Sequence, residues 1–254
     1  MDAQASMRRG FGVTVWLREA LPEWTTLPFW LTSMLGDLAL IVPLVGLLYA
    51  RDVLGTLRRG DSPDEPLCSD GTAFVIAAVT GGLALIVLLE AVIAAPRPPE
   101  ELHAVDASPY GFPSGHAMAA TVVWGGLATW YAVGRPAHRY AAAGTIVALV
   151  AVSRLALGVH YLADVIAAVV LGAAWIALVS ALALDRPDRA FAVAIAVAIG
   201  AVVVTGGSSR AVVAAAGTVA ALVGWRTFEL EPVRRRLLAV STRARERVTA
   251  ESKA

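Results

Sequence analysis

The chain has 254 residues, of which 57% are hydrophobic and 16% charged, and its formal net charge at pH 7 is +1. This composition is typical of a polytopic membrane protein rather than a soluble domain, and the small net charge gives no argument for a nucleic-acid partner. Lipid cannot hydrogen-bond the backbone, so a spanning chain forms helices or a closed barrel. The apolar stretches lack the alternation of barrel strands. We expect an all-α, polytopic transmembrane helix bundle of about six to seven spans.

Residues 1–26 precede the first predicted span. The stretch at residues 10–17 is too short to be the apolar region of a signal peptide. Trp16, Trp24 and Trp30 are of the amphipathic type that settles among lipid headgroups. The sequence therefore predicts an N-terminal interfacial segment, with a helix lying at the membrane surface.

Seven stretches are long and apolar enough to cross a bilayer core, which takes about 20 helical residues. They are residues 27–50, 72–95, 115–133, 140–157, 161–184, 190–206 and 211–227. Clusters of proline and glycine separate them, because successive prolines remove backbone donors and end a helix. The predicted organisation is an interfacial segment (1–26), a transmembrane domain (27–228) and a basic C-terminal tail (229–254).

Positive charge in the loops predicts the orientation. An odd number of spans puts the termini on opposite sides, with six Arg and Lys residues on the N-terminal side and fifteen on the other. Positively charged loops stay cytoplasmic. We therefore expect a multi-pass protein of the cell membrane with a cytoplasmic C-terminus and an extracytoplasmic active site.

Three polar clusters lie at span ends that face the N-terminal side. They are Arg97-Pro98, Pro113-Ser114-Gly115-His116, and the stretch SRLALGVHYLAD from Ser153 to Asp164. A spacing of four residues places His160 and Asp164 on one helical face, where the carboxylate can fix the imidazole tautomer and leave the other nitrogen as base or nucleophile. The simpler alternative is an ion pair at a helix entrance.

The other two clusters suit an anion. Ser114 is a plausible N-cap and Gly115 allows close approach, so the helix start offers free N–H groups with His116 in its first turn. Arg97 and Arg154 carry permanent charge in a fork that matches phosphate oxygens. Alternatively, His116 is an interfacial histidine on a capped helix and Arg97 an anchor that reaches the headgroups.

Together these groups describe a site for phosphoryl transfer. Two arginines and a helix N-terminus can hold a tetrahedral oxyanion, while one histidine attacks phosphorus and the other protonates the leaving group. This chemistry requires no metal and no cofactor.

The sequence resembles the type 2 phosphatidic acid phosphatase superfamily, whose motifs are Lys-x6-Arg-Pro, Pro-Ser-Gly-His and Ser-Arg-x5-His-x3-Asp. The second matches at residues 113–116, the third matches at 153–164, and the resemblance covers about residues 70–184. It implies that His160 is a nucleophile that forms a phosphohistidine, that Asp164 orients it, and that His116 is the acid. It also implies that Arg97, Ser114, Gly115 and Arg154 bind the phosphate of a lipid phosphate or polyprenyl pyrophosphate.

Two acidic residues are possible modulators. Glu90 stands where the first motif has lysine, seven residues before Arg97, and would repel phosphate unless it is protonated or paired with an arginine. Its simpler interpretation is a residue that reaches the headgroups from a span end. Asp37 lies about ten residues into the first predicted span, with Arg97 or Arg154 as possible partners. A hydrogen bond between packed helices is the simpler interpretation there.

The leading hypothesis is a membrane phosphatase whose partners are a lipid phosphate substrate and membrane lipids, with no protein partner indicated. A second hypothesis keeps the fold but loses the activity, leaving a phospholipid-binding or structural protein. A vanadate-dependent peroxidase is disfavoured because those enzymes are mainly soluble, and a transporter because no pair of broken helices is evident. The sequence leaves open which lipid is used, monophosphate or pyrophosphate, and the oligomeric state.

Overall fold

The computed structural model describes residues 9–59, 65–131 and 133–251, with side chains as far as residue 243. Its α-helices are α2 (Phe11–Ala20), α3 (Thr26–Ser33), α4 (Leu38–Arg59), α5 (Asp70–Ile93), α6 (Gly115–Trp130), α7 (Pro136–Ala156), α8 (Leu162–Ala183), α9 (Pro187–Val204), α10 (Ser209–Glu229) and α11 (Glu231–Glu251). Short 3-10 turns are η1 (Glu23–Thr25), η2 (Met34–Gly36) and η3 (Glu100–Leu102). No strand occurs within these ranges, so the all-α prediction is confirmed.

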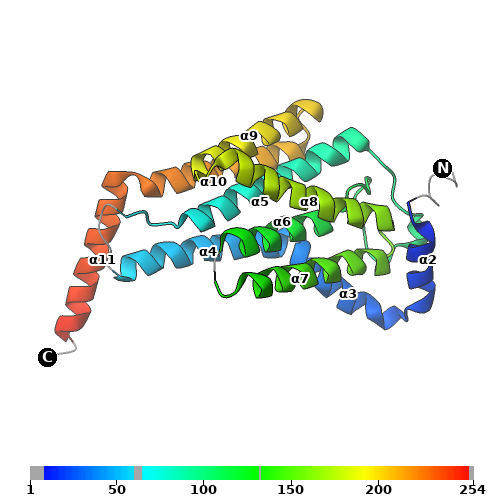
Figure 1. Ribbon diagram of the computed structural model, residues 1–254, viewed down its shortest axis with the longest axis horizontal. Coiled ribbons are helices and arrows are strands. Elements are labelled where there is room, and N and C mark those ends of the chain that lie inside the picture. The colour runs from blue at the N-terminus through cyan, green and yellow to red at the C-terminus, as the bar shows by residue number, and fades with distance from the viewer. Residues whose placement is uncertain (1–8, 60–64, 132, 252–254) are drawn as a thin grey trace.

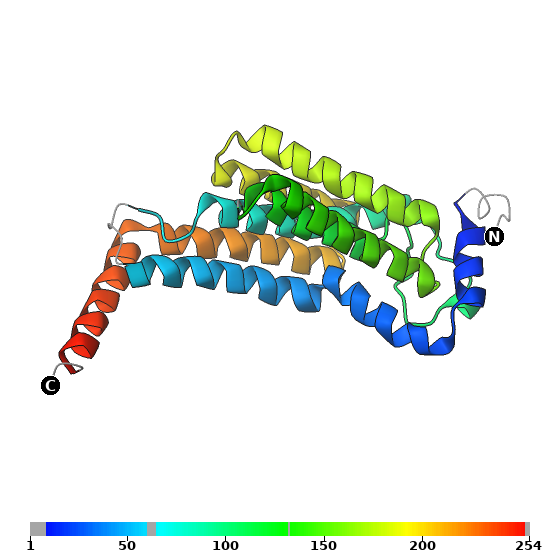
Figure 2. The same cartoon turned by 60° about the horizontal axis from the view of Figure 1, so that its bottom comes forward.

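Helices α4 to α10 pass back and forth along one direction and form an elongated bundle (Figure 1). Helix α2 lies across the end of the bundle near the N-terminus. Helix α11 projects at an angle from the opposite end, as the rotated view also shows (Figure 2). The loops that follow α5, α7 and α9 therefore meet at the end that α2 covers.

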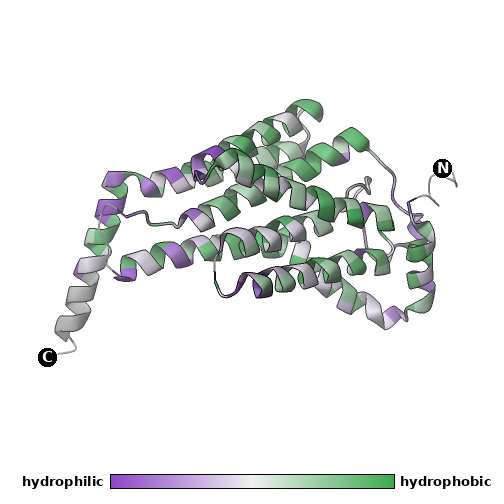
Figure 3. Ribbon diagram, viewed as in Figure 1, coloured by the Kyte–Doolittle hydropathy of each residue, from purple (hydrophilic) through white to green (hydrophobic). Residues whose placement is uncertain are grey.

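Six helices of the described chain are long and apolar enough to cross a membrane: α4, α5, α7, α8, α9 and α10. Hydrophobic residues dominate the length of the bundle and hydrophilic ones gather toward its ends (Figure 3). The prediction of a multi-pass membrane protein is confirmed. Positions of the spans also follow the sequence prediction closely from α7 onward.

The third predicted span is shorter than expected. Helix α6 begins at Gly115 but ends at Trp130 and has 16 residues, or about 24 Å at 1.5 Å per residue, less than a bilayer core. It packs against α5, α7 and α8, and buried residues follow one another along it from Ala117 to Val123. Its hydrophobic sequence thus reflects burial in protein more than contact with lipid.

The first predicted span, residues 27–50, is wrong in its bounds. The chain breaks at η2, and the membrane helix α4 starts at Leu38 and continues to Arg59. Gly36 packs against α6 so closely that a Cβ there would lie 2.2 Å from the carbonyl oxygen of His116. Asp37 is extended, and its carboxylate accepts a bond of 2.8 Å from the N–H of Ala39. Asp37 therefore caps α4 instead of lying within a span.

Small residues let α5 lie close to its neighbours in the centre of the bundle. A Cβ on Gly81 would lie 2.8 Å from the Cα of Ala194, so the backbones of α5 and α9 come almost into contact. The indole N–H of Trp175 in α8 donates to the carbonyl of Ala78 at 2.8 Å. These contacts fix α5, and with it the chain that leads from Ile93 to Arg97.

Candidate active site

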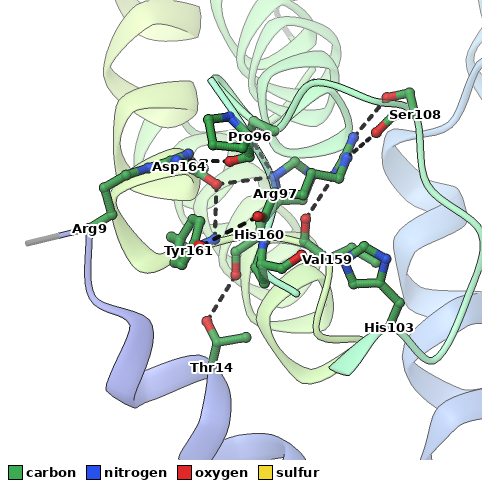
Figure 4. Close-up of polar contacts among 12 residues, drawn as sticks. Arg9, Thr14, Pro96, Arg97, His103, Ser108, Val159, His160, Tyr161 and Asp164 are labelled. Atoms are coloured by element: carbon green, nitrogen blue, oxygen red, sulfur yellow. Dashed lines mark hydrogen bonds and ion pairs between the residues drawn. The ribbon is translucent and has the colours of Figure 1, made fainter. Parts of the chain in front are cut away.

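The three polar clusters predicted from the sequence meet at the α2 end of the bundle. Arg97 follows α5, Ser114 and His116 lie at the start of α6, and His160 lies in the turn between α7 and α8. His160 is 1% exposed, and Asp164 is fully buried in the first turn of α8. Figure 4 shows the polar contacts around His160, Arg97 and Asp164.

The contacts of His160 define its tautomer. Its Nε2 lies 2.8 Å from Nη1 of Arg97, and its Nδ1 lies 2.8 Å from the carbonyl oxygen of Gly111. A guanidinium only donates, so Nε2 is the acceptor and the ring proton resides on Nδ1. Burial lowers the pKa of His160 to about 3, which keeps the imidazole neutral at physiological pH. The nitrogen with the lone pair therefore faces Arg97.

Asp164 lies near His160 but is not its closest partner. Its Oδ2 is 3.5 Å from Nδ1 of His160 and accepts the N–H of Tyr161 at 2.9 Å. His160 precedes α8, so the spacing of four residues acts through the helix N-terminus and not along one helical face as predicted. The carbonyl of Gly111 and the carboxylate of Asp164 therefore both lie near Nδ1–H.

The N-terminal segment completes this arrangement. Arg9 places Nη2 2.6 Å from Oδ1 of Asp164, and its Nη1 donates to the carbonyl of Pro96 at 2.8 Å (Figure 4). The hydroxyl of Thr14 in α2 donates to the carbonyl of His160 at 2.9 Å. Sequence reasoning missed both residues because they lie 155 and 146 positions from their partners. The predicted helix is present as α2, and its contact with the membrane stays a prediction.

Arg97 is held by backbone and side chain together. Its Nη1 donates to the carbonyl of Val159 at 2.8 Å, its Nη2 donates to the hydroxyl of Ser108 at 2.8 Å, and its Nε donates to the carbonyl of Ser108. These bonds tie the loop after α5 to the turn that carries His160. Arg97 is therefore a fixed member of the site, and the alternative of a headgroup anchor is wrong.

His116 pairs with Asp37. Its Nε2 lies 3.0 Å from Oδ2 of Asp37, and the hydrogen bond from His116 lowers the pKa of Asp37 to about 2. The expected partners of Asp37, Arg97 and Arg154, make no direct bond to it in the described chain. The sequence prediction placed Asp37 inside the first span, because that span was expected to continue unbroken past Gly36. The Gly-Asp pair before an apolar run was the available signal for a helix start.

Two buried polar groups of the site lack a hydrogen-bond partner among the described residues. They are the hydroxyl of Ser114 and Nε of Arg154, whose residues are 0% and 5% exposed. Ser114 is the N-cap of α6, as predicted, but its hydroxyl does not bond the helix. Since burying an unpaired polar group is costly, such groups are often reserved for a ligand.

Glu90 is buried and paired, not exposed to headgroups. It is 3% exposed, and its Oε2 lies 2.6 Å from Nη1 of Arg210 at the start of α10. Arg210 is one of the six basic residues that the sequence prediction assigned to the N-terminal side of the membrane, but that prediction did not connect it with the site. Glu90 itself was the signal in the sequence that a basic partner lies nearby, because a carboxylate in a span requires a counter-charge.

Six of the charged and imidazole side chains described above line one cavity of about 800 Å³ together with Asp37. Its polar end is lined by Arg97, His116, Arg154 and His160, with Glu90 and Arg210 beside them. From there it continues between apolar side chains of α4, α5 and α10, among them Val45, Ile76, Leu83, Val213 and Ala221. No three His, Cys, Asp or Glu side chains of the described chain are grouped so that they could hold a metal ion.

Gly158 controls the shape of the turn between Arg154 and His160. Its φ is +74°, and a Cβ there would lie 2.0 Å from the carbonyl oxygen of Leu102. We expect Gly158→Ala to lower the melting temperature in detergent by several degrees, because both the backbone and the adjacent loop must shift.

Gly144 offers a matched control, since it lies within α7 and a Cβ there would have nothing within 4 Å. Gly144→Ala should leave the melting temperature unchanged or raise it. Equal melting temperatures for the two variants would contradict the geometry assigned to Gly158.

Comparison with known proteins gives a family-model match and a similar fold. The PAP2 superfamily model matches residues 71–188. A similar solved structure is that of the first transmembrane PAP2 type phosphatidylglycerolphosphate phosphatase from Bacillus subtilis, with 25% sequence identity and a TM-score of 0.57. The match covers 73% of this chain and 89% of that one. No curated protein sequence matches the chain. Residues 71–188 thus match the PAP2 superfamily model, and the chain has the fold of a transmembrane PAP2-type phosphatase.

Proposed function

We propose that this protein hydrolyses a lipid phosphate or polyprenyl pyrophosphate through a phosphohistidine on His160, without a metal. The observation that carries the proposal is the position of His160, whose Nε2 contacts Arg97 and which lines one cavity together with Arg97, His116 and Arg154. Nucleophile, acid and cations thus share one site, which in-line transfer of a phosphoryl group requires.

In the first step, Nε2 of His160 forms a bond to phosphorus as the bond from phosphorus to the leaving oxygen breaks. Nδ1–H stays on the ring and is held by the carbonyl of Gly111 and by Asp164, so the developing imidazolium is stabilised. A protonated His116 has two N–H groups. One can bond Asp37, and the other can give its proton to the leaving oxygen.

In the second step, His116 is neutral and removes a proton from water as the water oxygen bonds to phosphorus. The bond between phosphorus and Nε2 breaks, its electron pair returns to His160, and inorganic phosphate leaves. Asp37 keeps its charge throughout because its pKa lies at about 2, so it can stabilise each protonated form of His116.

Charge around the phosphoryl oxygens would come from groups that are already buried. Arg97 bonds Nε2 of His160 in this structure, and the oxygens of an entering phosphate can take over that guanidinium and release the lone pair. The unpartnered Nε of Arg154 and hydroxyl of Ser114 offer two further donors. Gly115 carries no Cβ, and so allows a phosphate to approach the start of α6.

The apolar continuation of the cavity supports a lipid substrate. It runs between α4, α5 and α10, within the part of the bundle that the hydrophobic helices form. A hydrocarbon tail can lie there while the phosphate reaches the polar end. The similar Bacillus subtilis protein is named for phosphatidylglycerolphosphate, which makes that lipid one member of the class to test.

We also propose that the site faces the extracytoplasmic side. The loop after α5, the start of α6 and the turn between α7 and α8, which carry Arg97, His116 and His160, lie at the end of the bundle near α2 (Figure 1). In the sequence, most Arg and Lys residues belong to the loops of the opposite end and to the C-terminal tail. The rule that positive loops remain cytoplasmic supports this orientation.

A substrate panel tests the function. Purified protein in detergent with a chelator should release phosphate from at least one of phosphatidate, phosphatidylglycerolphosphate, a prenyl phosphate and a prenyl pyrophosphate. Turnover that persists in chelator agrees with the metal-independent mechanism. If none of the four is hydrolysed, with or without added Mg²⁺, the alternative of a lipid-binding protein without catalytic activity replaces this proposal.

A further inference from the structure

The cavity contains a carboxylate where an anionic substrate must enter. Glu90 lines it from α5, and its Oε1 lies 3.5 Å from the position that a Cβ on Gly115 would take. The carboxylate is therefore close to the start of α6. A bare negative charge in such a poorly solvated place would repel phosphate strongly.

Arg210 neutralises this carboxylate from a distant part of the chain. It is the second residue of α10, lies 120 positions from Glu90, and bonds Oε2 at 2.6 Å through Nη1. Its side chain is 55% exposed, so the pair with Glu90 does not bury it. Over the residues that the structure describes, Glu90 is the one side chain found to bond Arg210, which leaves further N–H donors available.

Arg210 also belongs to the electrostatic environment of the site. It lines the same cavity as Arg97 and Arg154. Burial lowers the pKa of Arg97, and the positive charge of Arg210 acts in the same direction, so the two guanidiniums sense each other. The remaining acids on the cavity wall are Asp37, which is paired with His116, and Asp106 in the loop. An anion placed between Arg97 and Arg210 would relieve the repulsion between them.

We propose that Arg210 binds the substrate phosphate and that Glu90 is a positioning residue that holds Arg210 at the cavity. The proposal rests on the proposed function and adds a binding residue to the same site. The Lys-x6-Arg-Pro motif has a cation at the position of Glu90. In this chain the carboxylate at that position instead holds a cation supplied by α10.

The test compares KM, kcat and melting temperature for Arg210→Ala, Arg210→Lys and the double variant Glu90→Gln with Arg210→Ala. Arg210→Ala should raise KM by about 10- to 100-fold, because it removes a charge-assisted bond and exposes Glu90 to the substrate. Arg210→Lys should recover most of this loss. The double variant should have a lower KM than Arg210→Ala, because it no longer contains the unpaired carboxylate.

Arg235→Ala is the matched control, since Arg235 forms an ion pair with Glu231 on α11, away from the site. Its KM should equal that of the wild type. If Arg210→Ala changes only the melting temperature and leaves KM unchanged, the pair is structural and the proposal is wrong. The same holds if the double variant is no better than Arg210→Ala.

A binding measurement separates this proposal from the proposed function. Inorganic phosphate should raise the melting temperature of the wild type and of Arg235→Ala, and should do so much less for Arg210→Ala. If the wild type hydrolyses no substrate but phosphate still stabilises it through Arg210, the function fails and the binding residue stands. If phosphate stabilises wild type and Arg210→Ala equally, Arg210 does not bind it.

Discussion

His160→Ala should abolish phosphate release, with kcat reduced by about 10⁴-fold or more, because it removes the imidazole that we propose forms the covalent intermediate. The imidazole is buried, its Nε2 contacts Arg97, and the residue lines the cavity. Rapid acid-free quenching of the wild type with radiolabelled substrate should also trap a phosphoenzyme that is stable in alkali and labile in acid. The variant should show none.

The pH dependence provides a second check on His160. A nucleophile with a pKa of about 3 loses activity only as the pH falls toward 3, because only then is Nε2 protonated. Any rise or fall of kcat/KM between pH 5 and 8 should therefore reflect the titration of groups other than His160. His138→Ala is the matched control, since His138 is exposed at the start of α7, and it should leave kcat unchanged. A His160→Ala variant that retains more than about 1% of wild-type kcat would contradict the assigned nucleophile.

His116→Ala should reduce kcat by about 10²- to 10⁴-fold, since general acid catalysis typically contributes that much. The loss should be smallest with an aryl phosphate, whose leaving oxygen needs no proton, provided formation of the phosphoenzyme limits the rate. Comparing alkyl and aryl phosphates thus separates the acid role of His116 from a role in binding. Equal losses with both substrates would contradict the assignment as the acid.

Asp37→Asn tests the acid role of His116 by changing the carboxylate that pairs with it. It keeps the size of the side chain but removes the charge 3.0 Å from Nε2 of His116. The protonated imidazole would lose stabilisation, so the alkaline limb of the kcat profile should move to lower pH. An unchanged profile would limit Asp37 to its visible role as the cap of α4.

Local patterns in the sequence predicted much of the fold and of the site. Long apolar stretches gave the all-α class and most of the membrane helices, because each span satisfies its backbone within itself. The two matching motifs placed His116, Arg154, His160 and Asp164 at one end of the bundle. In the structure the first three line one cavity, and Asp164 lies beside His160. The predicted bounds of two spans were wrong because an apolar stretch can be buried in protein as well as exposed to lipid. Helix α6 is apolar because protein surrounds it, and the first span is interrupted where Gly36 packs on His116.

Residue types at fixed short spacings predicted the kind of chemistry, because a histidine, its carboxylate and two arginines suit a phosphate. Which distant groups lie beside these residues depends on the tertiary structure. Arg9 reaches Asp164 and Arg210 reaches Glu90 across 155 and 120 positions, and Asp37 meets His116 through the break before α4. Helical periodicity relates residues three or four apart. Pairs between helices depend on how the loops and small-residue contacts bring those helices together, which no local pattern encodes.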